Sequence, residues 1–356
     1  MRIHNFSAGP AVLPLSVVQE LRQQLLELGD SGLGLMEISH RSGIFSDIVD
    51  AAIERTRRVL ALPQDFTVLF LQGGASTQFL GVPCNLLQGG VADYVDTGTW
   101  ATKAIKEAGR YGTARVVFSG KDEGYRRVPN SWEASPDAVY THWTSNNTIY
   151  GTEFHATPQI TGLNVCDASS DIASRPIDGS SFDVLYAGAQ KNLGPSGVTL
   201  VCLSPAAMER AARADAPTML AWRTHAKAKK GLFNTPNTLG IFVLERVLAW
   251  VEEQGLEALD AANQRKADAL YGLLDSSEFW RPHAELASRS RMNVTWRLAD
   301  AALEPVLAEE ALAAGFSGLK GHRSVGGLRA SIYNACPEES VTALVDFLRD
   351  FEVKHG

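Results

Sequence analysis

Seven short apolar runs, separated by stretches with helical periodicity, constrain the fold of this chain most strongly. They cover residues 67–71, 92–95, 114–118, 138–142, 164–168, 184–186 and 198–203. Most of them end in a turn that contains Gly or Asp, and helical patterns such as 78–87 and 102–111 lie between them. This alternation is typical of a mostly parallel sheet covered by helices. The sequence therefore predicts an α/β fold with a mostly parallel seven-stranded sheet, in which ligands bind at the carboxyl ends of the strands.

The pattern changes beyond about residue 240. Two long helices are expected over 241–254 and 256–276, and shorter helices over 301–314 and 339–353, with strand-like runs at 291–298 and 327–334. We therefore expect an N-terminal segment over 1–15 that joins the small domain, a large domain over 16–255, and a smaller α+β C-terminal domain over 256–356. Small-molecule sites tend to lie in the cleft between two such domains.

Composition narrows the class of protein. The 356 residues are 45% hydrophobic and 21% charged, and the formal net charge is −7 with no basic cluster, which disfavours a nucleic acid as partner. The apolar runs are strand-sized and the N-terminus has no apolar core of a signal peptide, so neither a membrane span nor secretion is expected. Four scattered cysteines without a CxxC pair predict a cytoplasmic protein without disulfides or a metal site; they are Cys84, Cys166, Cys202 and Cys336.

Lys191 stands between two apolar runs, in the segment FDVLYAGAQKNLGPSGVTLV over 182–201. An exposed loop lysine is the ordinary interpretation of such a residue. These flanks, however, would place the amine at a strand end in poorly solvated surroundings, where burial favours its neutral, nucleophilic form. A lysine of this kind forms a covalent bond with carbonyl compounds, and pyridoxal phosphate is the commonest cofactor that uses one.

Asp167 ends the apolar run at 164–168, one strand before Lys191. It suits two roles equally well on spacing alone. As a helix N-cap it would accept hydrogen bonds from the following turn. As a partner of the pyridinium nitrogen it would keep the cofactor ring protonated and therefore able to stabilise a carbanion.

The segment QGGASTQ at 72–78 follows the first strong strand and opens a helix. Glycines allow a ligand to approach the main chain, and a helix N-terminus offers free N–H groups to a phosphate. A simple tight turn explains the Gly-Gly pair equally well. The segment matches neither a Walker loop nor GxGxxG, so a nucleotide is disfavoured.

Four further sites follow strand ends or lie in Gly/Ser-rich loops. Trp100 is expected in a loop where it could stack on a planar ring, and Thr148 could donate a hydrogen bond to that ring, although packing and turn roles are commoner. Two His-Arg pairs, at 40–41 and 322–323, and Arg329 suggest a positive pocket for a dianionic substrate, because arginine binds carboxylate and phosphate in bidentate fashion.

Six segments together resemble the phosphoserine aminotransferase family, which belongs to the class-V aminotransferases of pyridoxal phosphate-dependent fold type I. They are NFSAGP at 5–10, EISHR at 37–41, DASS at 167–170, AGAQKN at 187–192, FNTP at 233–236 and GHR at 321–323. The resemblance runs nearly end to end. It implies reversible amino transfer from L-glutamate to 3-phosphohydroxypyruvate in serine biosynthesis, and a related reaction giving 4-phosphohydroxy-L-threonine in pyridoxine biosynthesis.

The same resemblance implies which residues hold the cofactor. Lys191 would be the covalent attachment point and the catalytic residue, Asp167 the partner of the ring nitrogen, Trp100 the stacking side chain and Thr148 the neighbour of the ring's 3-oxygen. The cofactor's phosphate would be held across a homodimer with shared active sites, by Ala75, Ser76 and Gln190 of one subunit and Asn234 and Thr235 of the other.

For the substrates the resemblance implies Arg329 as the partner of the α-carboxylate. The distal phosphate or glutamate carboxylate would be bound by His40, Arg41, His322 and Arg323. Some members of the family have an arginine where this chain has Ser76. The main-chain N–H groups remain available there, and the other basic residues must supply the positive charge.

Other interpretations use the same residues. An alanine–glyoxylate type aminotransferase would not need the paired His-Arg segments, and a cysteine desulfurase would need a mobile cysteine loop, whereas Cys336 follows a strand-like run. A non-catalytic protein with this fold would bind the cofactor without responding to glutamate. A lysine-dependent aldolase would require eight βα units, more than the pattern contains.

Overall fold

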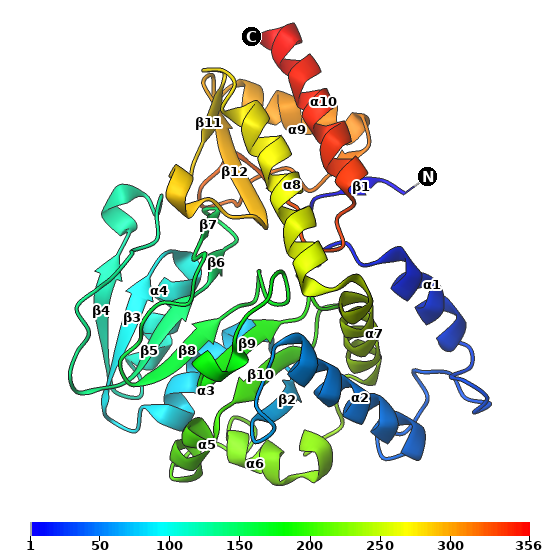
Figure 1. Cartoon of the computed structure of the whole chain (residues 1–356), viewed down its shortest axis with the longest axis vertical. Helices are drawn as coiled ribbons and strands as arrows, with labels where there is room; N and C mark the ends of the chain where they lie inside the picture. Colours follow the sequence, from blue (N-terminus) through cyan, green and yellow to red (C-terminus); the bar gives the residue numbers. More distant parts are fainter. Residues whose placement is uncertain (1) are drawn as a thin grey trace.

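A seven-stranded sheet forms the centre of the computed structural model, which describes residues 2–356 (Figure 1). Its strand order is β2-β10-β9-β8-β5-β3-β4. Strand β10 runs antiparallel to both of its neighbours, and the remaining pairs are parallel, so the predicted mostly parallel sheet is confirmed. The bounds are β2 (Thr67–Leu71), β3 (Val91–Asp96), β4 (Thr113–Ser119), β5 (Ala138–Thr144), β8 (Leu163–Asp167), β9 (Val184–Gly188) and β10 (Thr199–Leu203).

Helices cover both faces of this sheet because successive side chains of a strand point to opposite faces. In β9, Leu185 and Ala187 join the hydrophobic cluster of one face, and Val184 and Tyr186 join that of the other. The first face is covered by α2 (Gly43–Val59) and α7 (Thr238–Gln254), with α1 (Leu15–Gln24) beside α7. The second face is covered by α3 (Gly74–Leu86), α4 (Thr99–Ala108), α5 (Pro205–Ala212) and α6 (Trp222–Lys227).

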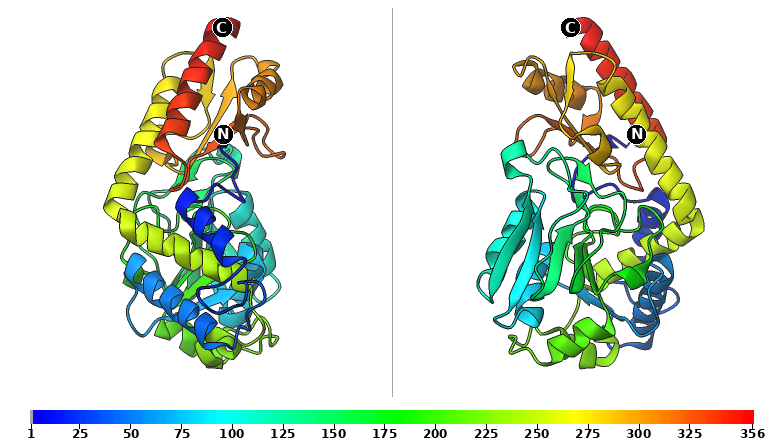
Figure 2. Two further views of the ribbon diagram at one scale, coloured as in Figure 1. Left: turned by 90° about the vertical axis from the view of Figure 1, so that its right-hand side faces the viewer. Right: turned by 60° about the vertical axis from the view of Figure 1, so that its left-hand side comes forward.

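The C-terminal part has its own antiparallel sheet in the order β11-β12-β14. Helices α8 and α10 lie side by side against it (Figure 2). A separate hydrophobic cluster surrounds Trp296 and takes in Phe6 from the N-terminal segment, whose β1 pairs with β13. The bounds are β1 (His4–Asn5), α8 (Leu256–Leu274), β11 (Trp280–Pro282), β12 (Asn293–Leu298), α9 (Leu303–Ala313), β13 (Phe316–Ser317), β14 (Leu328–Ser331) and α10 (Glu338–His355).

Short elements complete the chain. They are the pair β6 (Asn146–Asn147) and β7 (Thr152–Glu153), and the 3-10 turns η1 (Lys121–Glu123), η2 (Gly179–Ser181), η3 (Lys229–Gly231) and η4 (Leu286–Ser288). The division into segments 1–15, 16–255 and 256–356 stays a prediction. Between residues 2 and 356, no helix has the length and apolar character that a membrane crossing requires.

Two helices begin earlier than predicted. Helix α3 begins at Gly74 instead of residue 78, and α4 begins at Thr99 instead of residue 102. Gly73 and Gly98 precede them with φ of 95° and 154°, so the glycines end the turn and the helix follows at once. The expectation that Trp100 lies in a loop was therefore wrong, because it lies in the first turn of α4.

Candidate functional site

Five connections at the carboxyl ends of the sheet strands enclose a cavity of about 240 Å³. Strands β2, β3, β5, β8 and β9 all end at this edge, because each runs in the same direction. The lining comes from the residues that follow them: Gly73, Gly74, Ala75, Ser76, Phe79, Trp100, Thr144, Asn146, Asp167, Ser169, Ser170, Gln190 and Lys191. The edge of the sheet that the sequence predicts for ligand binding is thus the edge that carries this cavity.

Lys191 extends from the turn after β9 into the cavity, where its side chain is largely removed from solvent. Its Nζ donates a hydrogen bond to Thr148 Oγ1 and lies 5.9 Å from the centroid of the Trp100 ring. Burial and the nearby Arg329 cation together lower the pKa of Lys191 to about 8, although Asp167 opposes the shift. The neutral form of this amine, which attacks a carbonyl carbon, is therefore far more populated near physiological pH than in an ordinary lysine.

Asp167 lies at the end of β8 and is 3% exposed. Its Oδ1 accepts hydrogen bonds from the main-chain N–H and the hydroxyl of Ser169, at 3.0 and 2.6 Å. Within residues 2–356 its Oδ2 has no hydrogen-bond donor, although the side chain lines the cavity. Burial raises the pKa of Asp167, while Ser169 and Lys191 oppose that shift. One carboxylate oxygen is thus taken up by the turn, and the other is free to accept a hydrogen bond from a ligand.

The first turn of α3 forms the end of the cavity nearest β2. Gly73 has φ of 95°, and a Cβ atom there would come within 1.8 Å of Thr77 Oγ1, so a glycine is required. The helix start leaves the N–H groups of Gly74, Ala75 and Ser76 without partners in the helix, and all three residues line the cavity. Such N–H groups, together with the positive end of the helix dipole, suit a phosphate group.

Arg329, on β14 of the C-terminal part, lies near Lys191 without lining the cavity itself. Its Nη1 donates to the main-chain oxygen of Thr148 at 3.1 Å, and its buried Nε has no acceptor within residues 2–356. Burial lowers the pKa of Arg329, as expected for a guanidinium held without a carboxylate. The unpartnered donor beside Lys191 suits an incoming carboxylate.

The loop 321–327 brings further positive charge near Arg329. His322 Nδ1 lies 2.6 Å from Ser324 Oγ. Burial lowers the pKa of His322, and three neighbouring cations lower it further, namely Arg329, Arg323 and Lys103. Because each of these charges acts on the same imidazole, His322, Arg323 and Arg329 share one electrostatic environment.

Lys103 is a site residue that the sequence analysis missed. It lies one turn after Trp100 on α4, and its Nζ is 4.4 Å from the centroid of the Trp100 ring. The spacing of three residues along a helix could have revealed it, once α4 is known to begin at Thr99. The other missed residues line the cavity just past strand ends, and their polar type was the available signal; they are Thr144, Asn146, Ser169 and Ser170.

Eight predicted site residues do not line this cavity within one chain. Thr148, His322, Arg323 and Arg329 are linked to it through contacts or charges near Lys191, and the other four are not. His40 is half-buried and Arg41 is exposed, and neither forms a side-chain hydrogen bond or ion pair with another predicted site residue in the described part of the chain. They belong to the connection between α1 and α2, which runs along the right-hand side of Figure 1. Asn234 and Thr235 lie beside Gln72, whose Nε2 donates to the Thr235 oxygen at 3.1 Å.

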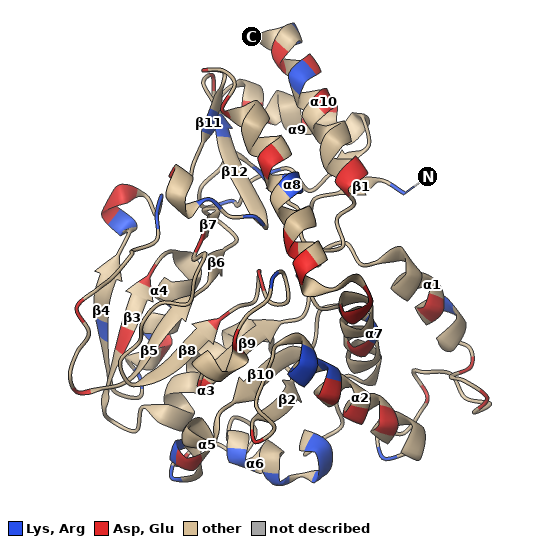
Figure 3. Cartoon of the chain, viewed as in Figure 1, with Lys and Arg blue, Asp and Glu red and all other residues tan. Residues whose placement is uncertain are grey.

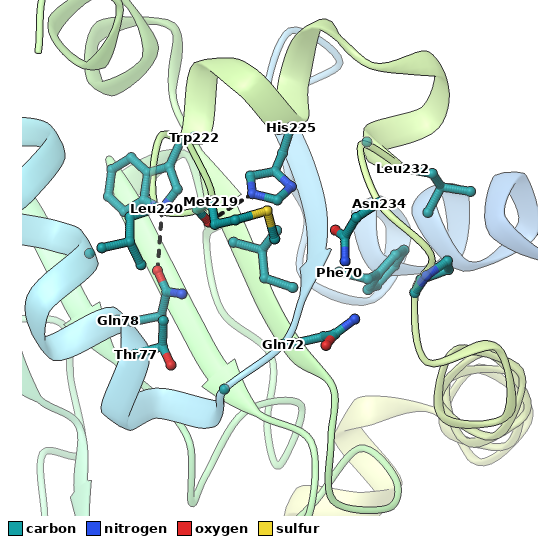
Figure 4. Close-up of a pocket in the computed structure, with 15 residues that line it drawn as sticks. Phe70, Gln72, Thr77, Gln78, Met219, Leu220, Trp222, His225, Leu232 and Asn234 are labelled. Carbon is teal, nitrogen blue, oxygen red and sulfur yellow. Dashed lines mark hydrogen bonds between the residues drawn. The ribbon is translucent and has the colours of Figure 1, made fainter. Parts of the chain in front are cut away.

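Asn234 lines a second cavity of about 350 Å³ on the other side of the α3 N-terminus (Figure 4). Polar side chains that line this second cavity form hydrogen bonds with one another or with the main chain. Trp222 Nε1 donates to Gln78, and His225 contacts the Met219 oxygen. Gly73 lines both cavities. This larger space contains no lysine or carboxylate, so the chemistry resides in the smaller cavity.

The smaller cavity fits pyridoxal phosphate. It offers an amine for covalent attachment, a buried carboxylate oxygen without a donor, a row of free N–H groups and the Trp100 side chain. These features lie in separate connections of one sheet edge and converge on a volume suited to a small cofactor.

Comparison with known proteins gives a consistent assignment. The model of the family described as aminotransferase class-V matches residues 3–344. A protein of Desulfatibacillum aliphaticivorans named phosphoserine aminotransferase is 49% identical over alignment of 100% of this chain and 99% of its own length.

Solved structures agree with this likeness. The phosphoserine aminotransferase of Bacillus circulans subsp. alkalophilus superposes with a TM-score of 0.96 at 44% identity, over 100% of this chain and 99% of that one. The pyridoxal phosphate-bound phosphoserine aminotransferase of Trichomonas vaginalis superposes with a TM-score of 0.93 at 34% identity, over 98% of this chain and 100% of that one. The expected fold type I architecture is therefore confirmed.

Proposed function

The chain belongs to the aminotransferase class-V family of pyridoxal phosphate-dependent enzymes, and on that premise we propose that it transfers the amino group of L-glutamate to 3-phosphohydroxypyruvate, giving O-phospho-L-serine and 2-oxoglutarate. The names of its full-length relatives support this pair of substrates. The observation that carries the proposal is the position of the Lys191 amine, which shares one cavity with the Asp167 carboxylate and has the Arg329 guanidinium beside it.

Three side chains perform the common part of the reaction. Pyridoxal phosphate, when bound, supplies the electron sink that stabilises a carbanion. Asp167 presents its free Oδ2 to the ring nitrogen and so maintains the positive charge there. Arg329 binds the substrate α-carboxylate, and Lys191 takes the proton from the substrate α-carbon as general base and returns it as general acid.

The remaining contacts fix the cofactor. Trp100 would cover one face of the ring, and Thr148 holds the Lys191 amine before attachment. Ala75 and Ser76 at the start of α3 would hold the phosphate group, and Gln190 lines the same cavity. Each of these contacts comes from a different strand end, so the rigid sheet determines their relative positions.

The distal anion of either substrate binds to basic residues at the entrance of the cavity. Phosphoserine and glutamate share an α-carboxylate and an α-amino group and differ in the distal group, a phosphate or a carboxylate. His322 and Arg323 provide positive charge there, and His40 and Arg41 complete the set when a second copy of the chain supplies them.

A homodimer with shared sites explains why some predicted residues lie outside the cavity. Large apolar side chains are exposed near both displaced segments, including Leu26 (84%) and Met36 (69%) near His40, and Met219 (53%) and Phe233 (46%) near Asn234. Exposed side chains of this size favour burial against a partner. We also place the enzyme in the cytoplasm, an environment that suits its four buried thiols.

A substrate panel tests the proposed function. With glutamate as amino donor, we expect much faster turnover of 3-phosphohydroxypyruvate than of glyoxylate or pyruvate, because only the phosphorylated acceptor satisfies the basic mouth. Faster turnover of glyoxylate would instead indicate an alanine–glyoxylate type enzyme. A visible absorbance band that glutamate leaves unchanged would indicate a non-catalytic protein and contradict the proposal.

A further inference from the structure

Three consecutive main-chain oxygens after β8 accept hydrogen bonds from three buried asparagines. Asn192 Nδ2 donates to the Ile172 oxygen at 2.7 Å. Asn334 Nδ2 donates to the Ala173 oxygen at 2.7 Å, and Asn263 Nδ2 donates to the Ser174 oxygen at 3.0 Å. We call the turn 172–174 and these three asparagines the amide clamp.

The three asparagines come from different parts of the fold. Asn192 directly follows Lys191, Asn334 lies in the connection between β14 and α10, and Asn263 lies on α8. They are 6%, 7% and 1% exposed, respectively. The clamp therefore joins the lysine's own segment to two elements of the C-terminal part.

The asparagines are also bonded to one another. The main-chain N–H of Asn334 donates to Asn192 Oδ1 at 3.0 Å, and Asn263 Nδ2 donates to Asn334 Oδ1 at 2.8 Å. The acceptor turn has an unusual conformation, because Ala173 has φ of 55°, in the left-handed region. A non-glycine residue in that region is strained, so the surrounding hydrogen bonds must hold it in place.

The clamp links the chain segments that carry the two groups that must handle one substrate. Arg329 lies five residues before Asn334, on β14, and Lys191 is the residue before Asn192. The distance between the guanidinium and the amine therefore depends on how the C-terminal part is seated on the sheet. Buried amide hydrogen bonds of this kind fix such an arrangement more specifically than apolar contacts do, and within residues 2–356 Asn263 Oδ1 is the one amide oxygen of the clamp without a donor.

We propose that Asn192 and Asn334 are positioning residues that fix Arg329 relative to Lys191, so that a substrate whose α-carboxylate is bound presents its α-carbon to the lysine amine. This inference rests on the proposed function for its substrates. A shift of about 1 Å between positioning groups and reacting atoms can cost up to about a hundredfold in rate. Both half-reactions use the same α-carboxylate, so the clamp serves both.

The test compares Asn192→Ala and Asn334→Ala with Asn85→Ala in the full-length holoenzyme. Asn85 is a matched control because it is buried, donates to the Gly81 and Leu220 oxygens, and accepts from the Trp222 N–H, away from the cavity. We expect similar losses of melting temperature in all three variants. We expect kcat/KM to fall about tenfold for both glutamate and phosphoserine in the two clamp variants only.

A second readout does not depend on turnover. In the apoenzyme, the pH dependence of Lys191 acylation, followed by peptide mass spectrometry, reports the pKa of its amine. Since the Arg329 cation lowers that pKa, a loosened clamp is expected to move the midpoint upward in the two clamp variants and not in Asn85→Ala. If one clamp variant does not fold, the other still provides both the kcat/KM values and the acylation midpoint.

Three results would overturn the inference. One is clamp variants that lose stability as Asn85→Ala does but keep both kcat/KM values within about twofold. Another is a fall in kcat/KM for only one of the two substrates, since glutamate and phosphoserine have the same α-carboxylate and α-amino group. The third is an unchanged acylation midpoint. A wild-type enzyme inactive on phosphoserine would instead contradict the proposed function, and the acylation measurement would still decide the role of the clamp.

Discussion

Lys191 gains its reactivity from surroundings that disfavour its own charge. Burial and the Arg329 cation together lower its pKa to about 8. The neutral amine is the reactive form, so its fraction rises as pH passes through about 8. Attachment of pyridoxal phosphate to the apoenzyme should therefore accelerate with pH and level off above that midpoint, as followed by absorbance.

The same argument predicts the effect of the neighbouring cation. Arg329→Met removes a charge that lowers the Lys191 pKa, so the attachment midpoint should move to higher pH. Arg349→Met is the control, because Arg349 lies on α10 and pairs with Asp346 far along the C-terminal helix. A wild-type midpoint near 10.5, the ordinary value for lysine, would contradict this account.

Replacing the lysine separates chemistry from folding. Lys191→Ala removes the attachment point and the proton carrier together, so turnover should fall by more than about a thousandfold. The fold should survive, because the substitution deletes one hydrogen bond, to Thr148, and a partly buried charge. Circular dichroism and the melting temperature check the fold, and coupled-assay rates check the activity. Near-normal turnover would show that another residue carries the reaction.

Residues at strand ends were predictable, and residues that depend on contacts between distant segments were not. Lys191 and Asp167 stand out in the sequence because a charge beside a buried strand needs a reason. Asn192, by contrast, resembles any turn asparagine until Asn334 and Asn263 are seen to meet it in space. Lys103 was hidden for a different reason, since its place beside Trp100 depends on where α4 begins.

At the scale of elements, the strands followed from the sequence better than the helix starts did. Apolar runs locate a buried strand directly, and all seven sheet strands overlap the predicted ones. Glycines before α3 and α4 indicate a turn but not its length, and both helices begin immediately after the glycine. Pro83 lies inside α3, where a proline would ordinarily argue for a helix end.

The start of α3 leads to a prediction about the cofactor's phosphate. Gly73→Ala would put a Cβ within 1.8 Å of Thr77 Oγ1 at φ of 95°, which should displace the first turn and its N–H groups. We expect the affinity for pyridoxal phosphate to fall at least about tenfold, because displacement of these N–H groups adds to the cost of left-handed backbone for alanine. Equilibrium dialysis or quenching of protein fluorescence measures it.

Gly74→Ala is the matched control for that experiment. Gly74 also has positive φ, at 69°, but an added Cβ there meets no atom within 4 Å. Its alanine variant carries the backbone strain without the clash, so the loss of affinity should be smaller than for Gly73→Ala. Equal losses would show that strain alone, and not the displaced turn, weakens binding.

At the scale of the whole molecule, a single chain explains only part of the predicted site. The sheet edge and the C-terminal part bring Lys191, Asp167 and Arg329 together. The segments that carry Arg41 and Asn234 lie elsewhere, and no local pattern in the sequence indicates which copy of a chain a residue will serve. Figure 3 shows Lys and Arg interspersed with Asp and Glu along α2, α8 and α10, so net charge alone also gives no indication of the site.

Mixing two variants tests whether Arg41 serves the site of a second copy. Arg41→Ala should weaken binding of phosphoserine, because a charge-assisted pair with phosphate is lost, and Lys191→Ala should be inactive. In a shared-site dimer, a mixed pair regains one complete site, since the Lys191→Ala chain supplies Arg41 to the intact lysine of its partner. Refolding the two variants together should therefore restore a wild-type KM for phosphoserine, with a maximal rate of about a quarter of the wild-type value for random pairing.

If Arg41 serves its own chain, mixing creates no complete site and the KM of Arg41→Ala persists. An unchanged KM in Arg41→Ala alone would remove this arginine from the site altogether.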